Sequence, residues 1–99
     1  MELKKEQNGN AMTFSLIGRL DAVTAPQLEK AVQTELSDIT DLTIDLSELS
    51  YVASAGLRVL LMAQKLMSQK GSMKLTHVNQ DVMEVLEMTG FVNFLTIEK

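Results

Sequence analysis

The chain has 99 residues, 45% of them hydrophobic, which is enough for one modest apolar core but not for two. Its 13 acidic and 9 basic residues give a net charge of −4, which argues against nucleic acid as a partner, because such binding depends on cations that neutralise phosphates. The lack of cysteine excludes disulfides and cysteine-ligated zinc, and no apolar run is long enough to cross a membrane. We therefore expect one cytoplasmic domain over residues 1–99, without a membrane partner.

The amino-terminal part of the chain predicts a β-hairpin. Residues 3–7 form a charged edge-strand candidate, and residues 8–10 (Asn-Gly-Asn) form a turn. Residues 12–17 then alternate apolar and polar side chains, as a half-buried strand does. Two adjacent strands joined by so short a turn are expected to be antiparallel.

The first predicted helix follows this hairpin. Thr24 is a suitable N-cap, Pro26 suits the first turn, and Gln27 occupies the capping-box position three residues after Thr24. Apolar side chains then recur at helical spacing, at Leu28, Ala31, Val32 and Leu36. A polar turn over residues 38–41 ends this segment.

The middle of the chain predicts a strand, a polar turn and a second helix. Residues 42–46 place every second, apolar side chain on one face of a strand. A polar stretch then leads to Ser54, a suitable N-cap for a helix that runs to about Gln69 and stops at Gly71.

The last part of the chain predicts a strand over residues 72–78, a short helix and a final strand over residues 94–97. Asn79 or Gln80 opens that helix, Met88 faces inward and Gly90 ends it. The order β-β-α-β-α-β-α-β predicts an α/β fold with a mixed sheet. The opening hairpin is antiparallel, the later strands are parallel, and the helices pack against the sheet.

Ser54 is the residue most suited to chemistry, because its hydroxyl stands where a helix begins. One interpretation is that it only caps the helix; the other is that the hydroxyl is modified or contacted by a partner. A hydrolase nucleophile elbow needs glycine two residues before the serine, where this chain has Val52. The single histidine, His77, lies on a predicted strand among apolar residues, so we expect no enzyme.

Phosphate-binding glycine loops and metal-ligand spacings are absent from the sequence, so we expect no cofactor and no metal. Asp21 and Asp45 lie near the ends of two predicted strands, which can bring them to the same sheet edge as Ser54. Asp21 is equally well explained as a turn residue, and Asp45 as a solvent-facing strand residue. Gly56 allows close approach of backbone or partner, or is simply tolerated in the first helical turn.

Four segments, in this order, resemble the STAS domain of bacterial anti-sigma-factor antagonists. They are GRLD at 18–21, IDLS at 44–47, YVASAGL at 51–57 and MTGF at 88–91, and they span nearly the whole chain. Family members typically carry Asp-Ser-Ser/Thr-Gly-Leu at the switch, and a partner kinase phosphorylates the serine that follows the aspartate. That position corresponds to Ser54, and Ala53 and Ala55 stand where the family has the aspartate and the second hydroxyl residue.

We expect a partner to contact the exposed side of the helix that begins at Ser54, together with the loop before the first helix. Arg58 lies one turn after Ser54, and exposed Met and Arg are favoured at interfaces. Arg58 as a solvated charge and Met62 as a core residue are equally compatible with the pattern. The expected contact residues are Thr24, Ala53, Ala55, Leu57, Arg58 and Met62.

The resemblance implies a binding module that sequesters an anti-sigma factor with serine kinase activity and is switched off by phosphorylation of Ser54. A PP2C-type phosphatase would be a further partner. The alternative is a stand-alone STAS subunit that binds the ATPase of a transporter, or another partner, without phosphorylation. A neighbouring kinase or phosphatase gene would favour the first function, and neighbouring transporter genes the second.

Overall fold

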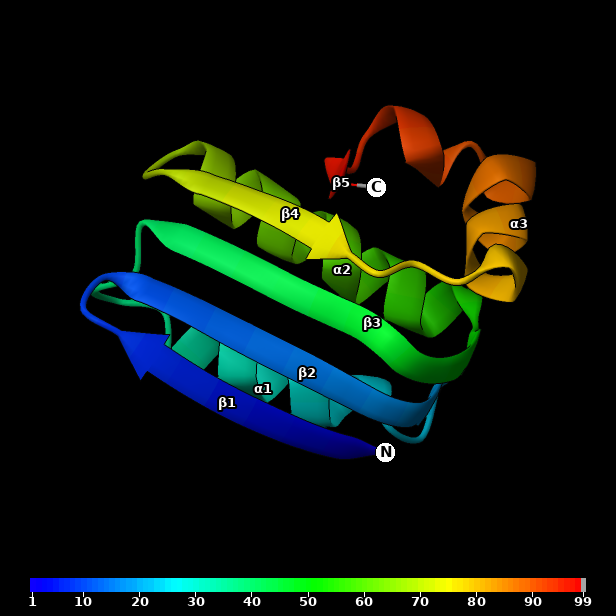
Figure 1. Cartoon of the computed structure of the whole chain (residues 1–99), viewed down its shortest axis with the longest axis horizontal. Coiled ribbons are helices and arrows are strands. Elements are labelled where there is room, and N and C mark those ends of the chain that lie inside the picture. The colour runs from blue at the N-terminus through cyan, green and yellow to red at the C-terminus, as the bar shows by residue number, and fades with distance from the viewer. Residues whose placement is uncertain (99) are drawn as a thin grey trace.

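The computed structural model describes residues 1–98 (Figure 1). Its elements follow the predicted order, with one short 3₁₀-helix, η1, added near the end. They are β1 (Glu2–Asn8), β2 (Ala11–Leu20), α1 (Ala25–Thr34), β3 (Asp41–Val52), α2 (Ser54–Ser68), β4 (Ser72–Thr76), α3 (Gln80–Thr89), η1 (Phe91–Asn93) and β5 (Ile97–Glu98).

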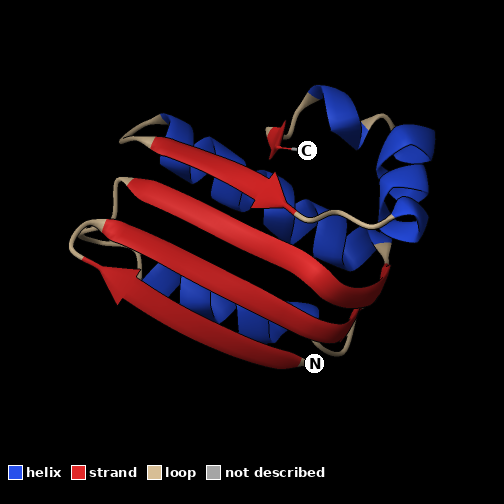
Figure 2. Ribbon diagram, in the orientation of Figure 1, coloured by secondary structure: helices blue, strands red, loops and turns tan. Residues whose placement is uncertain are grey.

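The strands form one mixed sheet in the order β1-β2-β3-β4-β5. β1 and β2 are antiparallel and every other neighbouring pair is parallel, which confirms the predicted fold class. Each parallel connection moves one strand further in the same direction, so right-handed crossovers place their helices on the same side. Figure 2 shows α1 and α2 behind the sheet, with α3 beside the end of β3 and β4.

The two faces of the sheet differ in polarity. The side chains of Phe14, Ile44 and Leu75 point to the helices and are fully buried. Alternate residues such as Ser15, Thr43 and Asp45 point to the opposite face and are only partly buried. This polar open face explains how a largely parallel sheet is stable with helices on one side only.

β3 is longer than the sequence predicts, because two bulges hide its period. Its buried residues are spaced by two up to Leu46 and by three from there, at Leu49 and Val52. The register with β2 shifts twice over this stretch, and each shift inserts one extra residue into β3. Ser47 to Tyr51, predicted as a polar turn, are therefore strand residues.

The end of the chain departs from the prediction in two respects. Met88, expected to face inward, is 86% exposed, and Phe94, expected in the last strand, is 65% exposed. The final strand is shorter and later, because the chain after Gly90 first forms η1. The predicted cap at Asn79 is confirmed: its side-chain oxygen accepts a hydrogen bond from the Val82 N–H at 2.9 Å. Gly90 ends α3 with φ 80°, as predicted.

The first turn of α2 packs directly on the end of β2. The Ala53 N–H donates to the Leu20 carbonyl at 2.9 Å, and a Cβ added at Gly56 would lie 2.5 Å from Cγ of Leu20. Leu20 itself is fully buried. Glycine at position 56 is therefore required by the approach of the chain to itself, not by tolerance.

We predict that Gly56→Ala lowers the free energy of unfolding by about 1–3 kcal/mol, because it overpacks the contact with Leu20. Urea denaturation followed by circular dichroism measures the change. The double variant Leu20→Ala/Gly56→Ala is the control, since removing the opposing side chain frees the space that the new methyl group needs. Strictly additive costs in the double variant would contradict this account.

Candidate functional site

Ser54 stands at the sheet edge where β2 and β3 end. Leu20 of β2 pairs with Val52 of β3, and α2 begins two residues after Val52. Ser54 is exposed, and within residues 1–98 its hydroxyl makes no hydrogen bond. The hydroxyl is therefore available to a partner or a modifying enzyme.

Ala53, not Ser54, occupies the N-cap position of α2. Its backbone is extended (φ −104°, ψ 171°), and its carbonyl accepts from the Gly56 and Leu57 N–H groups. Ser54 is already the first helical residue, so the predicted capping role of its side chain is wrong. Alanine offers no side-chain oxygen to the free N–H groups, which leaves this end of α2 without a side-chain cap.

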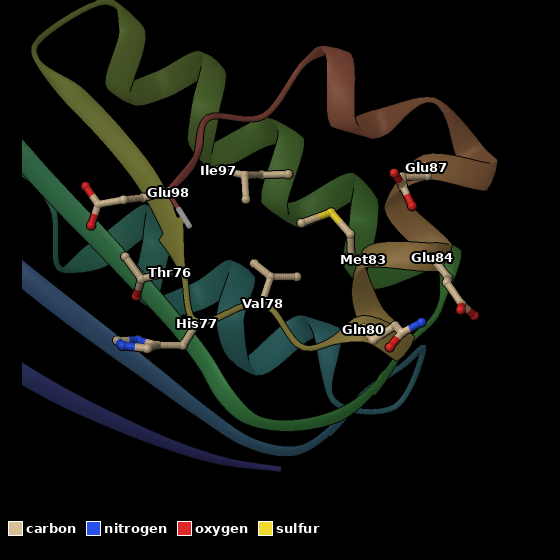
Figure 3. A pocket seen from close by; sticks show the side chains of 9 residues that line it. All are labelled: Thr76, His77, Val78, Gln80, Met83, Glu84, Glu87, Ile97 and Glu98. Carbon is tan, nitrogen blue, oxygen red and sulfur yellow. The ribbon is translucent and has the colours of Figure 1, made fainter.

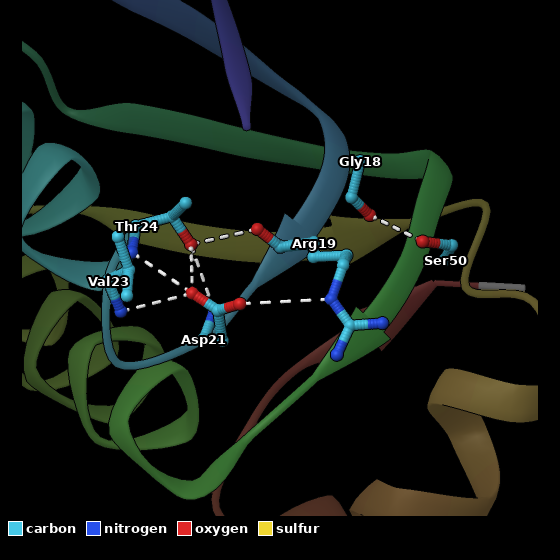
Figure 4. A network of polar contacts seen from close by, with 6 residues as sticks. All are labelled: Gly18, Arg19, Asp21, Val23, Thr24 and Ser50. Carbon is cyan, nitrogen blue, oxygen red and sulfur yellow. Dashed lines mark hydrogen bonds and ion pairs between the residues drawn. The ribbon is translucent and has the colours of Figure 1, made fainter.

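Asp21 organises the loop between β2 and α1 (Figure 4). Its Oδ1 atom accepts hydrogen bonds from the backbone N–H groups of Val23 at 3.0 Å and Thr24 at 3.1 Å. The Thr24 hydroxyl accepts from the Asp21 N–H at 2.9 Å, and its own proton is shared between the Arg19 carbonyl at 2.8 Å and Oδ1 of Asp21 at 3.2 Å. Thr24 therefore closes the loop instead of capping α1 with its side chain, and Gln27 contributes only its backbone N–H, bonded to the Thr24 carbonyl.

These hydrogen bonds favour the ionised form of Asp21. The Thr24 N–H above all holds the pKa of the Asp21 carboxyl below its ordinary value of 3.8, against an opposing effect of burial. The Thr24 hydroxyl, the Val23 N–H and the Arg19 guanidinium, whose Nε lies 3.7 Å from Oδ2, lower the pKa further. The loop beside Ser54 thus carries a fixed negative charge at neutral pH.

Arg19 and Tyr51 form a second contact at the same edge, which the sequence did not single out. The second bulge makes Ser50 the extra residue of β3, and its hydroxyl donates to the Gly18 carbonyl at 2.8 Å. This shift sets Tyr51 opposite Arg19, whose guanidinium lies 4.3 Å from the centre of the tyrosine ring. Tyr51 and Val23 remain exposed, at 41% and 86%.

A groove of about 300 Å³ runs between α1 and α2, beginning one residue after Ser54. Three of the predicted contact residues, Ala55, Arg58 and Met62, line its α2 side. Its other lining residues were not predicted and come mainly from the α1 side: Ala22, Ala25, Pro26 and Glu29, together with Val59 of α2. Sequence patterns could not indicate them, because small and apolar residues at the start of a helix are equally typical of its core face.

Three predicted site residues are not part of the exposed surface around Ser54, although Gly56 lies close to Ser54 in the first turn of α2, as expected. Leu57 is 2% exposed and belongs to the core, so its side chain is not a contact residue. Gly56 is buried on β2. Asp45 lies seven residues before Val52, the last residue of β3, and therefore roughly 20 Å along the strand. There its Oδ1 accepts from the Ser47 N–H and lies 3.4 Å from Nδ1 of His77.

Two further observations concern classes of function. Within residues 1–98, no group of three or more His, Cys, Asp or Glu side chains is arranged to hold a metal ion. No helix in this part of the chain is long and apolar enough to cross a membrane.

The family model described as "Mlab, STAS domain" matches residues 3–96. The chain belongs to the STAS domain family. Among curated relatives, the anti-sigma-B factor antagonist of Bacillus subtilis is 29% identical over 93% of this chain and 85% of its own length. This confirms the resemblance noted in the sequence.

Solved structures of the family share the fold of this STAS domain. An anti-sigma factor antagonist from Mycobacterium paratuberculosis superposes with a TM-score of 0.86 at 24% identity, covering 97% of this chain and 83% of the other. The Bacillus cell fate determinant SpoIIAA in its phosphorylated form gives a TM-score of 0.76 at 17% identity, covering 99% and 92%.

We predict that Ala53→Asp raises the free energy of unfolding by about 1 kcal/mol, because the carboxylate accepts from the free N–H groups of α2 and suits its dipole. Urea denaturation measures the gain. Ala53→Asn is the matched control, since it supplies the capping oxygen without the charge. A variant with aspartate that is no more stable than the parent would contradict the cap geometry.

We predict that Asp21→Asn lowers the free energy of unfolding by an amount that depends on pH. Because folding lowers the pKa of Asp21, its ionised form stabilises the fold fully above the ordinary value of 3.8. That stabilisation is lost as the pH falls through the folded-state pKa. Urea midpoints of the two proteins should therefore converge in acid, while the carboxyl ¹³C shift reports the titration directly. Titration of Asp21 at or above 3.8 would refute the proposed hydrogen bonding.

Proposed function

We propose that this STAS domain protein is an anti-sigma-factor antagonist that binds an anti-sigma factor with serine kinase activity and is released by phosphorylation of Ser54. The observation that carries the proposal is the exposed, unbonded Ser54 hydroxyl beside the α1–α2 groove. A small hydroxyl at the margin of a groove is compatible with a bound partner, whereas a phosphate at the same place is not.

The fold itself should tolerate the phosphate. A group of about −1.5 to −2 charges at the first residue of α2 faces free backbone N–H groups and the positive end of the helix. Arg58 lies four residues after Ser54, on the same side of the helix, and is exposed. The ionised Asp21 loop opposes the new charge. These effects are of similar size and opposite sign, so modification should change the surface more than the stability.

The charge would change the affinity of the partner more than the stability of the fold. The groove beside Ser54 is lined largely by small and apolar side chains, with Arg58 and Glu29 as its charged residues. A partner that covers this groove would bury the phosphate next to apolar surface, and burying a charge without full compensation costs several kcal/mol. Each 1.4 kcal/mol or so is a tenfold change in affinity, so release follows.

The names of the relatives support an anti-sigma-factor antagonist that can carry a phosphate. The Bacillus subtilis relative and the Mycobacterium structure are both named as anti-sigma factor antagonists. SpoIIAA, which has the same fold, has been solved in a phosphorylated form. If a kinase adds a phosphate to this chain, a phosphatase must remove it before the chain can bind again. We propose a PP2C-type enzyme for this step. The protein then acts by binding and release, without catalysis of its own.

We predict that incubation with the cognate kinase and ATP adds one phosphate to the chain, and that Ser54→Ala abolishes this labelling. Ser50→Ala is the matched control, because Ser50 lies at the same sheet edge but its hydroxyl is bonded to Gly18. Intact-protein mass spectrometry measures the modification. Labelling of Ser54→Ala to the parental level would refute the site.

The same kinase serves as the binding partner in calorimetry without nucleotide. Ser54→Asp should weaken binding by about tenfold or more, equal to about 1.4 kcal/mol, whereas Ser54→Ala should bind like the parent. Equal binding by all three proteins, with no phosphate on Ser54, would instead support the alternative function. The protein would then bind a transporter ATPase or another partner through the same groove. Ala53, which stands where the family resemblance implies an aspartate, is the feature that favours this alternative.

A further inference from the structure

A large hollow, with no lining residue in common with the surface around Ser54, lies between the end of β4, α3 and β5 (Figure 3). Its volume is about 620 Å³, and none of its lining residues belongs to the α1–α2 groove. The chain leaves β4 at His77 with φ 55°. α3 then lies beside the end of the sheet, not on the face that α1 and α2 cover (Figure 2). The Asn79 side chain then fixes the start of α3 by donating to the Leu49 carbonyl at 2.6 Å.

The floor of this hollow is apolar. Val78, Met83 and Ile97 come from three separate segments and point toward one another (Figure 3). All three are only partly buried, although each is a residue type that is usually buried in a core. Covering such exposed apolar side chains with a partner removes apolar surface from water, which is favourable in free energy.

The rim of the hollow is acidic. Glu84 and Glu87 of α3 and Glu98 of β5 surround the apolar floor. Glu98 lies 3.3 Å from the Lys74 ammonium, whereas Glu84 and Glu87 take part in no ion pair within residues 1–98. All ionisable side chains of α3 are acidic. The only basic group in the lining, His77, faces Asp45.

The hollow continues into a second one of about 330 Å³, which lies between α3 and the segment from η1 to β5. Met83, Glu87 and Ile97 line both. The two together form one depression, which we call the acidic trough. Its apolar lining residues come from several segments and offer a polypeptide segment more than one anchor position: Val78, Met83, Val92, Leu95 and Ile97.

We propose that the acidic trough is a second docking site, which binds a basic amphipathic peptide segment of a partner protein. Apolar anchors of the segment would cover Val78, Met83 and Ile97, and flanking lysines or arginines would face Glu84 and Glu87. Complementary charge selects the partner and sets its orientation, while the apolar contact supplies the affinity. This site is independent of Ser54 and of the α1–α2 groove.

The test is an NMR titration of the ¹⁵N-labelled full chain with a synthetic peptide whose leucine and phenylalanine anchors are flanked by lysines. A second peptide has glutamate in place of every lysine. We expect amide shifts confined to residues 76–87 and 92–98 with the basic peptide, and at least about tenfold weaker binding of the acidic one. Equal binding of the two peptides, or shifts centred elsewhere, would overturn the proposal.

Two substitutions on one helix separate the trough from the general surface. Met83→Arg places a cation and extra bulk on the floor and should weaken binding at least about tenfold. Met88→Gln is the control, because Met88 is on the same helix but 86% exposed and outside the lining. A neutral side chain there adds no cation four residues after Glu84, so this variant should bind like the parent. Circular dichroism confirms that each variant is folded. An unchanged affinity of Met83→Arg would refute the site.

Charge reversal keeps the proposal testable if Met83→Arg does not fold. The exposed pair Glu84→Lys/Glu87→Lys should lose the basic peptide and gain the acidic one. Ser54→Ala should bind the basic peptide like the parent, so failure at the trough and failure of the Ser54 switch give different results. Basic-peptide binding that survives the charge reversal would contradict the proposed recognition.

Discussion

The contact between the first turn of α2 and the end of β2 determines how Ser54 and the residues around it are arranged. The Ala53 N–H bonds the Leu20 carbonyl, and Gly56 lets the helix approach Leu20 more closely than any side chain would allow. Because α2 starts at this contact, its first residue is held at the sheet edge. Ser54 therefore presents its hydroxyl from a rigid support, which the proposed discrimination between a hydroxyl and a phosphate would require.

The irregularities of β3 serve the same region. The two bulges each add one residue to β3 relative to β2. They keep Leu46, Leu49 and Val52 on the core face. The second bulge also brings Tyr51 opposite Arg19, next to the loop that Asp21 and Thr24 close. Bulges often re-aim side chains beside functional sites, and here they place an aromatic ring, a cation and a carboxylate at one edge.

The α1–α2 groove and the acidic trough differ in character. The groove is small, with one cation and one carboxylate among mainly small and apolar lining residues, whereas the trough is larger and has a rim of carboxylates. A negative charge added at Ser54 changes the first directly, since Ala55 and Arg58 belong to its lining. No lining residue of the trough belongs to this groove. Each surface can therefore be altered by substitutions that leave the lining of the other unchanged.

Local pattern in the sequence determined most of the fold and the position of Ser54. Alternation defined β2 and the first half of β3, helical spacing defined the three helices, and Asn79 and Gly90 marked the limits of α3, because these signals depend on neighbours along the chain. The motifs around Ser54 indicated the STAS family for the same reason.

Only the tertiary structure decided which of the predicted residues act together. It showed that Leu57 is a core residue and not a contact residue, and it left Asp45 in the middle of β3, beside His77. It also brought Arg19 to Tyr51 and joined Val78, Met83 and Ile97 into one floor. These outcomes depend on strand register, bulges and the docking of helices on the sheet. Residues distant in sequence meet only through such contacts, and local periodicity carries no information about them.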